Sequence, residues 1–388
     1  MVAVSERHVF AERRAFMILN ALPNIGPHTM QRLLAAFHGD ARRILSATAD
    51  QLKMIPRVET LAAETIVNHR KYFNPEQEEA LLAALRGRFI AMADENYPKL
   101  LGEIPDAPIG LYAIGEIDNS LKNIAIIGSR TNTLYGLEIA RKLAMDLSNR
   151  GFCIVSGMAR GIDSAAHEGA LAANGKTIAV FGNGVDVIYP MENAALYKKI
   201  SENGAIVSEF TLGRRADKQT FPIRNRLIAG LCHAVIIVES DKFGGSMITA
   251  RFASEYGRHV FAVPGRIDQP SSSGCLSLIR EGATMLTCVE DIFEDLPYLC
   301  GIPEQKILSS VDFMPINRMP QVPQISCPIE RKVFDVIADE KSANLESVVK
   351  HSDLPPNSVV RSLQMLEMRG LTRKRYDGAF EVALRNAS

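Results

Sequence analysis

A repeated alternation of short apolar runs with amphipathic segments occupies the middle of this 388-residue chain, from Asn123 to about Phe293. The apolar runs are rich in Val and Ile and read, in chain order, NIAIIGSR, FCIVSG, KTIAVFG, AIVSEF, HAVIIVES and HVFAVPG. Segments with helical spacing lie between them, such as LYGLEIARKLAMDLSNRG and SMITARFASEYGR. Strands that are apolar on both faces and alternate with helices belong to a parallel sheet covered on both sides. The sequence therefore predicts an α/β fold with a doubly wound sheet, in a domain over residues 90–298.

The two flanks of this domain differ from it in composition. Residues 1–85 have helical patterns and little β-branched density, and they predict a small all-helical domain. Prolines without sustained periodicity indicate a Pro-rich linker over residues 299–327. Residues 328–388 carry three helical patterns and then two short runs around Asp377 and Gly378, which suggest a hairpin. Helices that end in such a hairpin predict a winged-helix domain.

Bulk composition restricts the classes of function. Lys+Arg and Asp+Glu both number 44, so a nucleic-acid function would have to come from local basic patches. The six cysteines show no Cys-x-x-Cys spacing, which predicts buried thiols in a reducing compartment and no metal site. The start of the chain lacks the apolar core of a signal peptide, and no run approaches membrane-spanning length. We therefore expect a soluble cytoplasmic protein that does not bind membranes.

The loop after the first predicted strand, Gly128 to Gly136, is the first candidate anion site. A glycine turn between a strand and a helix directs backbone N–H groups and the helix dipole at one anion. Its glycines lack the Gly-x-Gly-x-x-Gly spacing of dinucleotide sites, and Gly175–Thr177 lacks the Walker context, so no cofactor is predicted. Gly128, Ser129 and Arg130 remain candidates for binding an anion. The alternative is a tight turn that carries a surface arginine.

The second loop, Ser156 to Leu171, places Gly157, Arg160 and Gly161 at the carboxyl end of another strand. The two glycines permit close approach of a ligand to the backbone, and Asp163 is a candidate cap for the following helix. His167 lies four residues beyond Asp163 on the same helical face. No nucleophile or metal spacing accompanies this pair, so we interpret His167 as structural.

The third loop is the most basic, with five cations and one acid between Thr211 and Arg226. Arg224 and Arg226 precede the apolar run LIAGLC and appear at the entrance of a helix, where the dipole disfavours cations. Either a protein carboxylate or a bound anion must neutralise the charge of these two arginines. Lys218 and Asn225 lie beside them, and Phe221 is a candidate for stacking on a base or for packing the loop into the core.

A fourth loop, KFGGSMITA, places Lys242, Gly245 and Ser246 before a further helix. Ligands of open α/β sheets bind beyond the carboxyl ends of the strands, where all four loops must lie. A single phosphate does not need so many donors, whereas a chain of phosphates does.

These motifs resemble those of the DNA-processing protein A (DprA, also called Smf) family. GSR, SGMARGIDSAAHEGAL, GNGVDVIYP, SEF, FPIRNRLIAGL, GGSMITA and FAVPG occur in the family's order over roughly residues 95–290. GGSMITA departs from the usual SGSLITA but keeps Ser246. The resemblance implies an extended Rossmann domain that binds single-stranded DNA, hands it to the RecA-type recombinase in natural transformation, and forms a homodimer. The expected DNA-contacting residues are Gly128, Ser129, Arg130, Gly157, Arg160, Gly161, Lys218, Phe221, Arg224, Asn225, Arg226, Lys242, Gly245 and Ser246.

The flanks resemble the family less closely. Leu22–Leu34 looks like a helix-hairpin-helix and like the sterile-alpha-motif-like domain that the family often carries. In the second such segment, IPRVET, Arg57 replaces the expected glycine, which puts a second phosphate contact in doubt. The predicted wing holds Arg369, Arg373, Lys374 and Arg375, which suggest a contact with double-stranded DNA or with protein.

Three hypotheses follow. The first is a non-enzymatic binder of single-stranded DNA that acts as a recombination mediator. The second is a nucleotide phosphoribohydrolase of the lysine-decarboxylase-like Rossmann group, although FGGSMIT lacks that group's Pro-Gly-Gly-x-Gly-Thr motif. The third is a structural adaptor that holds a regulatory nucleotide.

Overall fold

The computed structural model of the protein describes residues 2–301, 325, 327–340, 342–375 and 378–383. The chain divides into two compact units. The first runs to Arg130 and resumes at Ile139, and the second consists of Thr131–Glu138 with the C-terminal segment. Most of the predicted linker, residues 299–327, lies outside the described residues.

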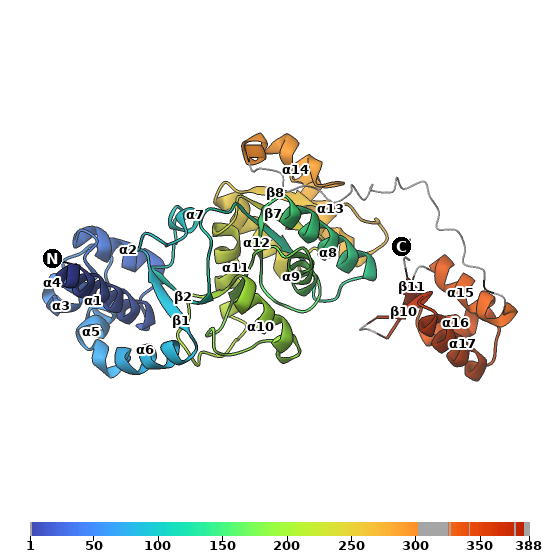
Figure 1. Ribbon diagram of the computed structural model, residues 1–388, viewed down its shortest axis with the longest axis horizontal. Coiled ribbons are helices and arrows are strands. Elements are labelled where there is room, and N and C mark those ends of the chain that lie inside the picture. The colour runs from blue at the N-terminus through green and yellow to red at the C-terminus, as the bar shows by residue number, and fades with distance from the viewer. Residues whose placement is uncertain (1, 302–324, 326, 341, 376–377, 384–388) are drawn as a thin grey trace. The chain divides into compact units, whose positions relative to one another are not determined.

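A mixed nine-stranded sheet forms the centre of the first unit as described (Figure 1). Its order is β1-β2-β6-β5-β4-β3-β7-β8-β9. The strands from β6 to β9 are all parallel, while β2 runs antiparallel to β6 and β1 antiparallel to β2. The strands are β1 (Gly87–Ala91), β2 (Gly110–Gly115), β3 (Asn123–Ile127), β4 (Cys153–Ser156), β5 (Thr177–Phe181), β6 (Ala205–Ser208), β7 (Ala234–Ile237), β8 (His259–Ala262) and β9 (Thr284–Met285).

Helices cover both faces of this sheet, which is why its central strands are apolar throughout. One layer contains α11 (Thr220–Gly230), α12 (Gly245–Glu255) and α13 (Ser273–Arg280). The other contains α9 (Ile162–Ala172) and α10 (Ala194–Asn203). The helices α7 (Lys99–Gly102), α8 (Leu134–Asn149) and α14 (Glu290–Asp295) also follow β1. The predicted Rossmann-type α/β fold is confirmed.

The N-terminal helices share a hydrophobic core with the sheet. They are α1 (Val2–Ala21), α2 (Pro27–Ala36), α3 (Ala41–Ser46), α4 (Ala49–Lys53), α5 (Thr60–Val67) and α6 (Pro75–Ala84). Their buried side chains, among them Phe16 and Ile66, belong to the same cluster as Phe89 of β1 and Tyr112 of β2. The rings of Phe89 and Tyr112 meet edge to face at 5.1 Å. Residues 1–85 therefore pack on the sheet as part of the first unit.

The turn at IPRVET adopts the conformation that glycine would favour. Arg57 has a φ of 62°, in the left-handed region, so the arginine keeps the backbone shape despite the side chain. In the segment Leu22–Leu34, Gly26 caps α2 and Pro27 is its first residue, as the sequence pattern indicates. None of the described helices is long and apolar enough to cross a membrane.

The described residues of the C-terminal segment form three helices and a short antiparallel ladder. The elements are α15 (Pro328–Glu340), α16 (Leu345–Ser352), α17 (Pro356–Met368), β10 (Thr372–Lys374) and β11 (Phe380–Val382). Val333, Phe334, Leu363 and Leu366 lie in its small core. This element order is the one that the sequence predicts for a winged helix. Asp377, at the predicted hairpin turn, lies outside the described residues.

Candidate nucleic-acid interface

Five loops meet at the carboxyl edge of the parallel strands, after β3, β4, β5, β6 and β7. The chain leaves β3 toward β4 on one side and returns as β7 on the other, so the order of the strands reverses there. Such a switch point is where open α/β sheets bind ligands. The N–H of Ser129 donates to the carbonyl oxygen of Glu239 at 2.7 Å, which ties the loops after β3 and β7 together.

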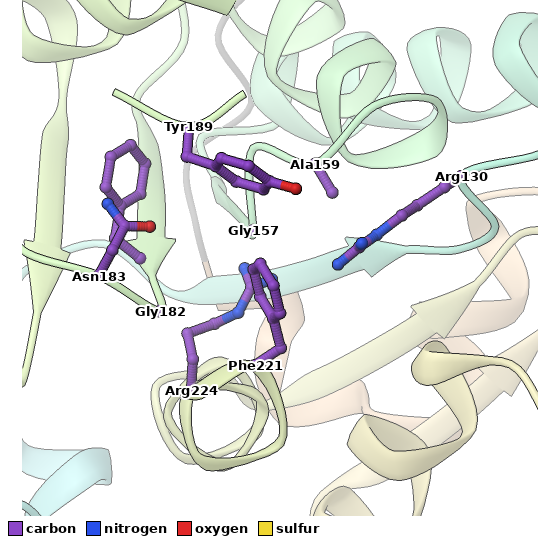
Figure 2. A pocket seen from close by; sticks show the side chains of 9 residues that line it. Arg130, Gly157, Ala159, Gly182, Asn183, Tyr189, Phe221 and Arg224 are labelled. Carbon is purple, nitrogen blue, oxygen red and sulfur yellow. The ribbon is translucent and has the colours of Figure 1, made fainter. Parts of the chain in front are cut away.

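A pocket opens at this edge, between the loops after β3, β4 and β5 and the start of α11 (Figure 2). Its lining comprises Arg130, Gly157, Ala159, Phe181, Gly182, Asn183, Tyr189, Phe221 and Arg224. Arg130 reaches toward the pocket from one side and Tyr189 from another, while Phe221 and Arg224 project from α11. The structure thus brings together four predicted residues from three separate loops: Arg130, Gly157, Phe221 and Arg224. Arg160, in the same loop as Gly157, does not line the pocket.

Arg130 is the exposed cation of this pocket. Its guanidinium carbon lies 4.8 Å from the centre of the Phe221 ring, and that ring in turn contacts Tyr189 at 5.7 Å between centroids. Among the described residues, no carboxylate forms an ion pair with Arg130. Phe221 is half-buried, so the same ring both pins the loop and holds the arginine head group. The guanidinium edge is available to an anion.

Arg224 forms the floor of the pocket and is buried. Its Nη1 donates to the carbonyl oxygen of Val180 at 2.8 Å. A Cβ placed on Gly157 would lie 1.6 Å from the same Nη1, so only glycine permits the guanidinium to lie there. Burial lowers the pKa of Arg224 to about 10, although the nearby Asp163 carboxylate opposes the shift. The buried guanidinium therefore closes the pocket from below.

Asp163 is the carboxylate that balances Arg224. It is buried, and burial raises the pKa of its carboxyl group although Arg224 and hydrogen bonds favour the charged form. Its Oδ2 accepts from the N–H of Gly157 at 3.2 Å and from that of Ala159 at 3.4 Å. Asp163 therefore fixes the glycine turn after β4 as well as offsetting the charge of the arginine.

Arg226 points away from the pocket into a buried network. Its Nη2 donates to both carboxylate oxygens of Glu209 at 2.5 Å, and its Nη1 donates to the backbone oxygen of Asp106. Tyr256 donates its hydroxyl to the Asp106 carboxylate at 2.6 Å. Burial raises the pKa of Glu209, while the arginine favours its charged form. A protein carboxylate thus neutralises Arg226. This is the first of the two alternatives that the sequence left open.

The expected helix boundary in this loop was wrong. α11 begins at Thr220, so Arg224 and Arg226 lie in the body of the helix rather than at its entrance. The start is fixed by Asp217, whose Oδ1 accepts from the N–H groups of Gln219 at 2.8 Å and Thr220 at 2.9 Å. These hydrogen bonds lower the pKa of Asp217, as expected for a carboxylate at a helix N-terminus.

The other predicted cations divide into paired and unpaired groups. Arg214 forms an ion pair with Asp217 at 2.6 Å, and Arg160 pairs with Glu192. Lys218 and Lys242 are exposed, and the described part of the chain offers neither of them an ion pair. Together with Arg130, these two lysines are the predicted contacts whose charge is open to solvent.

The remaining predicted residues shape the edge of the sheet. Ser246 is buried and donates to Oγ of Ser240 at 2.7 Å, while Asn225 donates to the backbone oxygen of Gly245 at 3.1 Å. Gly128 packs against Ile162, and Gly161 has a φ of 84°. In contrast, a Cβ on Gly245 would meet no atom within 4 Å, so the backbone at the start of α12 is open.

His167 is structural in its contacts. It is buried, and its Nδ1 lies 2.7 Å from Oγ1 of Thr177, which donates its own hydrogen to the carbonyl oxygen of Ile154. Nδ1 must therefore carry the proton of a neutral imidazole. Burial lowers the pKa of His167 to about 3, with Arg224 adding to the shift. Across the described chain, no group of three or more His, Cys, Asp or Glu side chains could hold a metal ion.

Sequence reasoning missed Tyr189 and Asn183 in the pocket lining. Both belong to the loop GNGVDVIYP after β5, where Asn183 donates to the carbonyl oxygen of Gly184 at 3.0 Å. This loop was part of the family resemblance but carries no cation. A pattern of basic residues therefore does not reveal Tyr189, which is 46% exposed.

Comparisons with known proteins identify the family of the chain. The sequence model of the family described as DNA recombination-mediator protein A matches residues 88–297. Protein Smf of Synechocystis sp. is 34% identical over 332 residues, which are 79% of this chain and 83% of that protein. DNA processing protein DprA of Streptococcus pneumoniae is 43% identical over 209 residues, 54% of this chain and 74% of the relative.

A solved structure gives the same result at the level of the fold. The X-ray structure of DNA processing protein A from Streptococcus pneumoniae matches with a TM-score of 0.64 and 32% identity, covering 73% of this chain and 97% of that one. The family match extends over more than half of the sequence and contains every residue of the pocket. The chain therefore belongs to the DNA-processing protein A (DprA/Smf) family of recombination mediators.

Proposed function

We propose that the protein binds single-stranded DNA at the carboxyl edge of its sheet. The observation that carries the proposal is Arg130, an exposed guanidinium without an ion pair among the described residues, held against Phe221 above the buried side chain of Arg224. Lys218 and Lys242 extend the positive charge along the same edge. A row of cations that no carboxylate neutralises suits a chain of phosphates.

The exposed ring of Tyr189 favours a single strand over a duplex. Bases of a single strand are unstacked and can lie on an aromatic face, whereas those of a duplex are stacked within the helix. Such stacking accepts every base, so recognition is largely independent of sequence. Phosphates and bases are then bound by different side chains of one pocket.

The family's description as a recombination mediator supports the next step, the loading of a RecA-type recombinase onto the bound strand. We propose that the protein performs this step without catalysis, in the cytoplasm, during DNA uptake and recombination, and as a homodimer through the Rossmann-type unit. Incubation with AMP tests the enzymatic alternative, because a phosphoribohydrolase would release free adenine. A mediator leaves the nucleotide intact.

The binding experiment measures affinity for oligo-dT as a function of salt concentration. A single strand releases counterions with a slope of about −0.7 per neutralised phosphate in a log–log plot. Arg130→Gln and Lys218→Gln each remove one cation, so each should weaken binding and reduce the slope by about 0.7. Arg251→Gln, on the exposed side of α12, is the matched control and should change neither quantity. Affinity that barely responds to salt would contradict the proposal.

A further inference from the structure

The loop after β7 presents an aromatic ring that no other part of the described chain covers. Phe243 is 93% exposed. A single exposed apolar side chain is commonplace and carries no argument by itself. Phe243 differs because of its neighbours: Lys242 precedes it, and the open backbone of Gly245 follows two residues later.

The turn that carries Phe243 is held by several hydrogen bonds. The N–H of Phe243 donates to Oδ1 of Asp241 at 3.0 Å, and the N–H of Lys242 donates to Oγ of Ser273 at 3.1 Å. The N–H of Gly244 donates to the backbone oxygen of Asp241 at 3.1 Å. A Cβ on Gly244 would lie 2.6 Å from Oγ of Ser240, so the turn is also tightly packed. The backbone therefore fixes the base of an outward-facing ring.

The position of the ring follows from the sheet. Tyr189 belongs to the loop after β5, Arg130 to the loop after β3 and Phe243 to the loop after β7. In the sheet these strands are ordered β5-β4-β3-β7, which places β5 and β7 about 15 Å apart at a strand spacing of about 4.8 Å. At about 3.4 Å per stacked nucleotide, about four nucleotides span that distance.

Charge along this path fits the same ligand. Arg130, after β3, and Lys242, next to Phe243, are exposed, and neither has an ion pair among the described residues. Arg160, after β4, is also exposed but pairs with Glu192. Asp241 is the carboxylate of the turn, and it accepts the N–H of Phe243. Two rings at separate points of the sheet edge, with cations beside them, suit a single strand whose bases stack and whose phosphates are neutralised.

We propose that Phe243 is a second stacking platform, on which a base of the DNA strand lies after the strand has crossed from Tyr189 past Arg130 and Lys242. This inference rests on the proposed function and extends it from one pocket to a path. A strand of about three nucleotides occupies the pocket alone. A strand of about twelve nucleotides reaches Phe243.

The chain contains no tryptophan, so Phe243→Trp introduces a single fluorescent reporter in the full-length protein. Its emission should be quenched when oligo-dT of about twelve nucleotides binds, and unchanged with about three. Met54→Trp, at an 84% exposed position in the N-terminal helices, is the matched control and should not be quenched by either. Phe243→Ala should weaken binding of the longer strand by at least about 5-fold and leave the shorter strand unaffected.

The outcomes separate this inference from the proposed function. Salt-dependent binding of the longer strand without quenching at Phe243→Trp overturns the platform and leaves the pocket in place. A change of oligomeric state in Phe243→Ala, measured by sedimentation, assigns the ring to a subunit contact and also overturns the platform. Absence of any oligo-dT binding by the unmodified protein overturns both.

Discussion

Three arginines that look equivalent in the sequence have different surroundings in the structure. Arg130 is exposed and stacks on Phe221, Arg224 is buried beneath the pocket, and Arg226 is bound by Glu209. The sequence could place all three at one sheet edge, because strand ends and glycine turns are local patterns. It could not show which ones are neutralised, since Glu209 and Asp163 lie at separate points of the chain.

His167 provides a test of stability at the scale of one residue. Its pKa in the folded protein is about 3, below the ordinary value of 6.5, so below pH 6.5 the unfolded chain takes up a proton that the folded chain does not. Stability is therefore lost as the pH falls from 6.5, by up to about 1.4 kcal/mol per pH unit. His167→Gln removes the titrating group.

Urea unfolding at pH 7 and at pH 5 measures this effect. Between these values, the unmodified protein should lose about 2 kcal/mol more of its free energy of unfolding than His167→Gln does. Other groups titrate alike in both proteins and cancel in the comparison. Parallel losses in the two proteins would show that His167 becomes protonated in the folded state.

At the scale of elements, α11 connects the pocket to the body of the protein. Its first turn carries Phe221, its middle carries Arg224, and Arg226 anchors it to Glu209 and Asp106. We expect Arg226→Ala to destabilise the protein by about 3–5 kcal/mol, because it leaves a buried carboxylate without its partner. The double variant Arg226→Met with Glu209→Gln should recover most of this loss, since it removes both charges.

DNA binding distinguishes this anchoring role from a direct contact. Since Arg226 points away from the pocket, Arg226→Lys should weaken oligo-dT binding through the position of α11 and leave the salt slope unchanged. A slope reduced by about 0.7, as expected for Arg130→Gln, would instead identify Arg226 as a phosphate contact.

The strands show what a pattern in the sequence can and cannot reveal. β3 to β8 all fall within the predicted apolar runs, because buried parallel strands are rich in Val and Ile. β1 and β2 were not predicted: Gly87 begins one, and Gly110 and Gly115 bound the other. Their antiparallel pairing depends on β6, a strand about 90 residues away from β2 along the chain.

At the scale of the whole molecule, the formal charge of zero conceals two basic surfaces. One consists of Arg130, Lys218 and Lys242 in the first unit, and the other of Arg373 and Lys374 in the second. The second unit has its own exposed cations, Arg373 and Lys374 of β10, whereas Arg369 pairs with Glu330 and Arg375 donates to Ser342. Composition alone could not reveal this division, because acidic residues elsewhere cancel the sum. Only the positions of the charges separate the two surfaces.

We expect these two cations to contact double-stranded DNA. Replacement of both Arg373 and Lys374 by Gln should lower the salt slope for duplex binding by about 2 and leave oligo-dT affinity unchanged. Lys332→Gln on α15 removes one exposed charge from the same unit and serves as the control. A loss of oligo-dT affinity with intact duplex binding would contradict this assignment.

The common core of the N-terminal helices and the sheet also restricts where this chain can be joined to a relative in a hybrid protein. Phe16 and Ile66 belong to the same apolar cluster as Phe89 and Tyr112. A chimera fused near residue 86 would therefore build this cluster from two different proteins. In a chimera whose first segment comes from another protein, the helices would not be shaped to pack on β1 and β2. A hybrid that folds well should therefore take the N-terminal helices and the first two strands from the same protein.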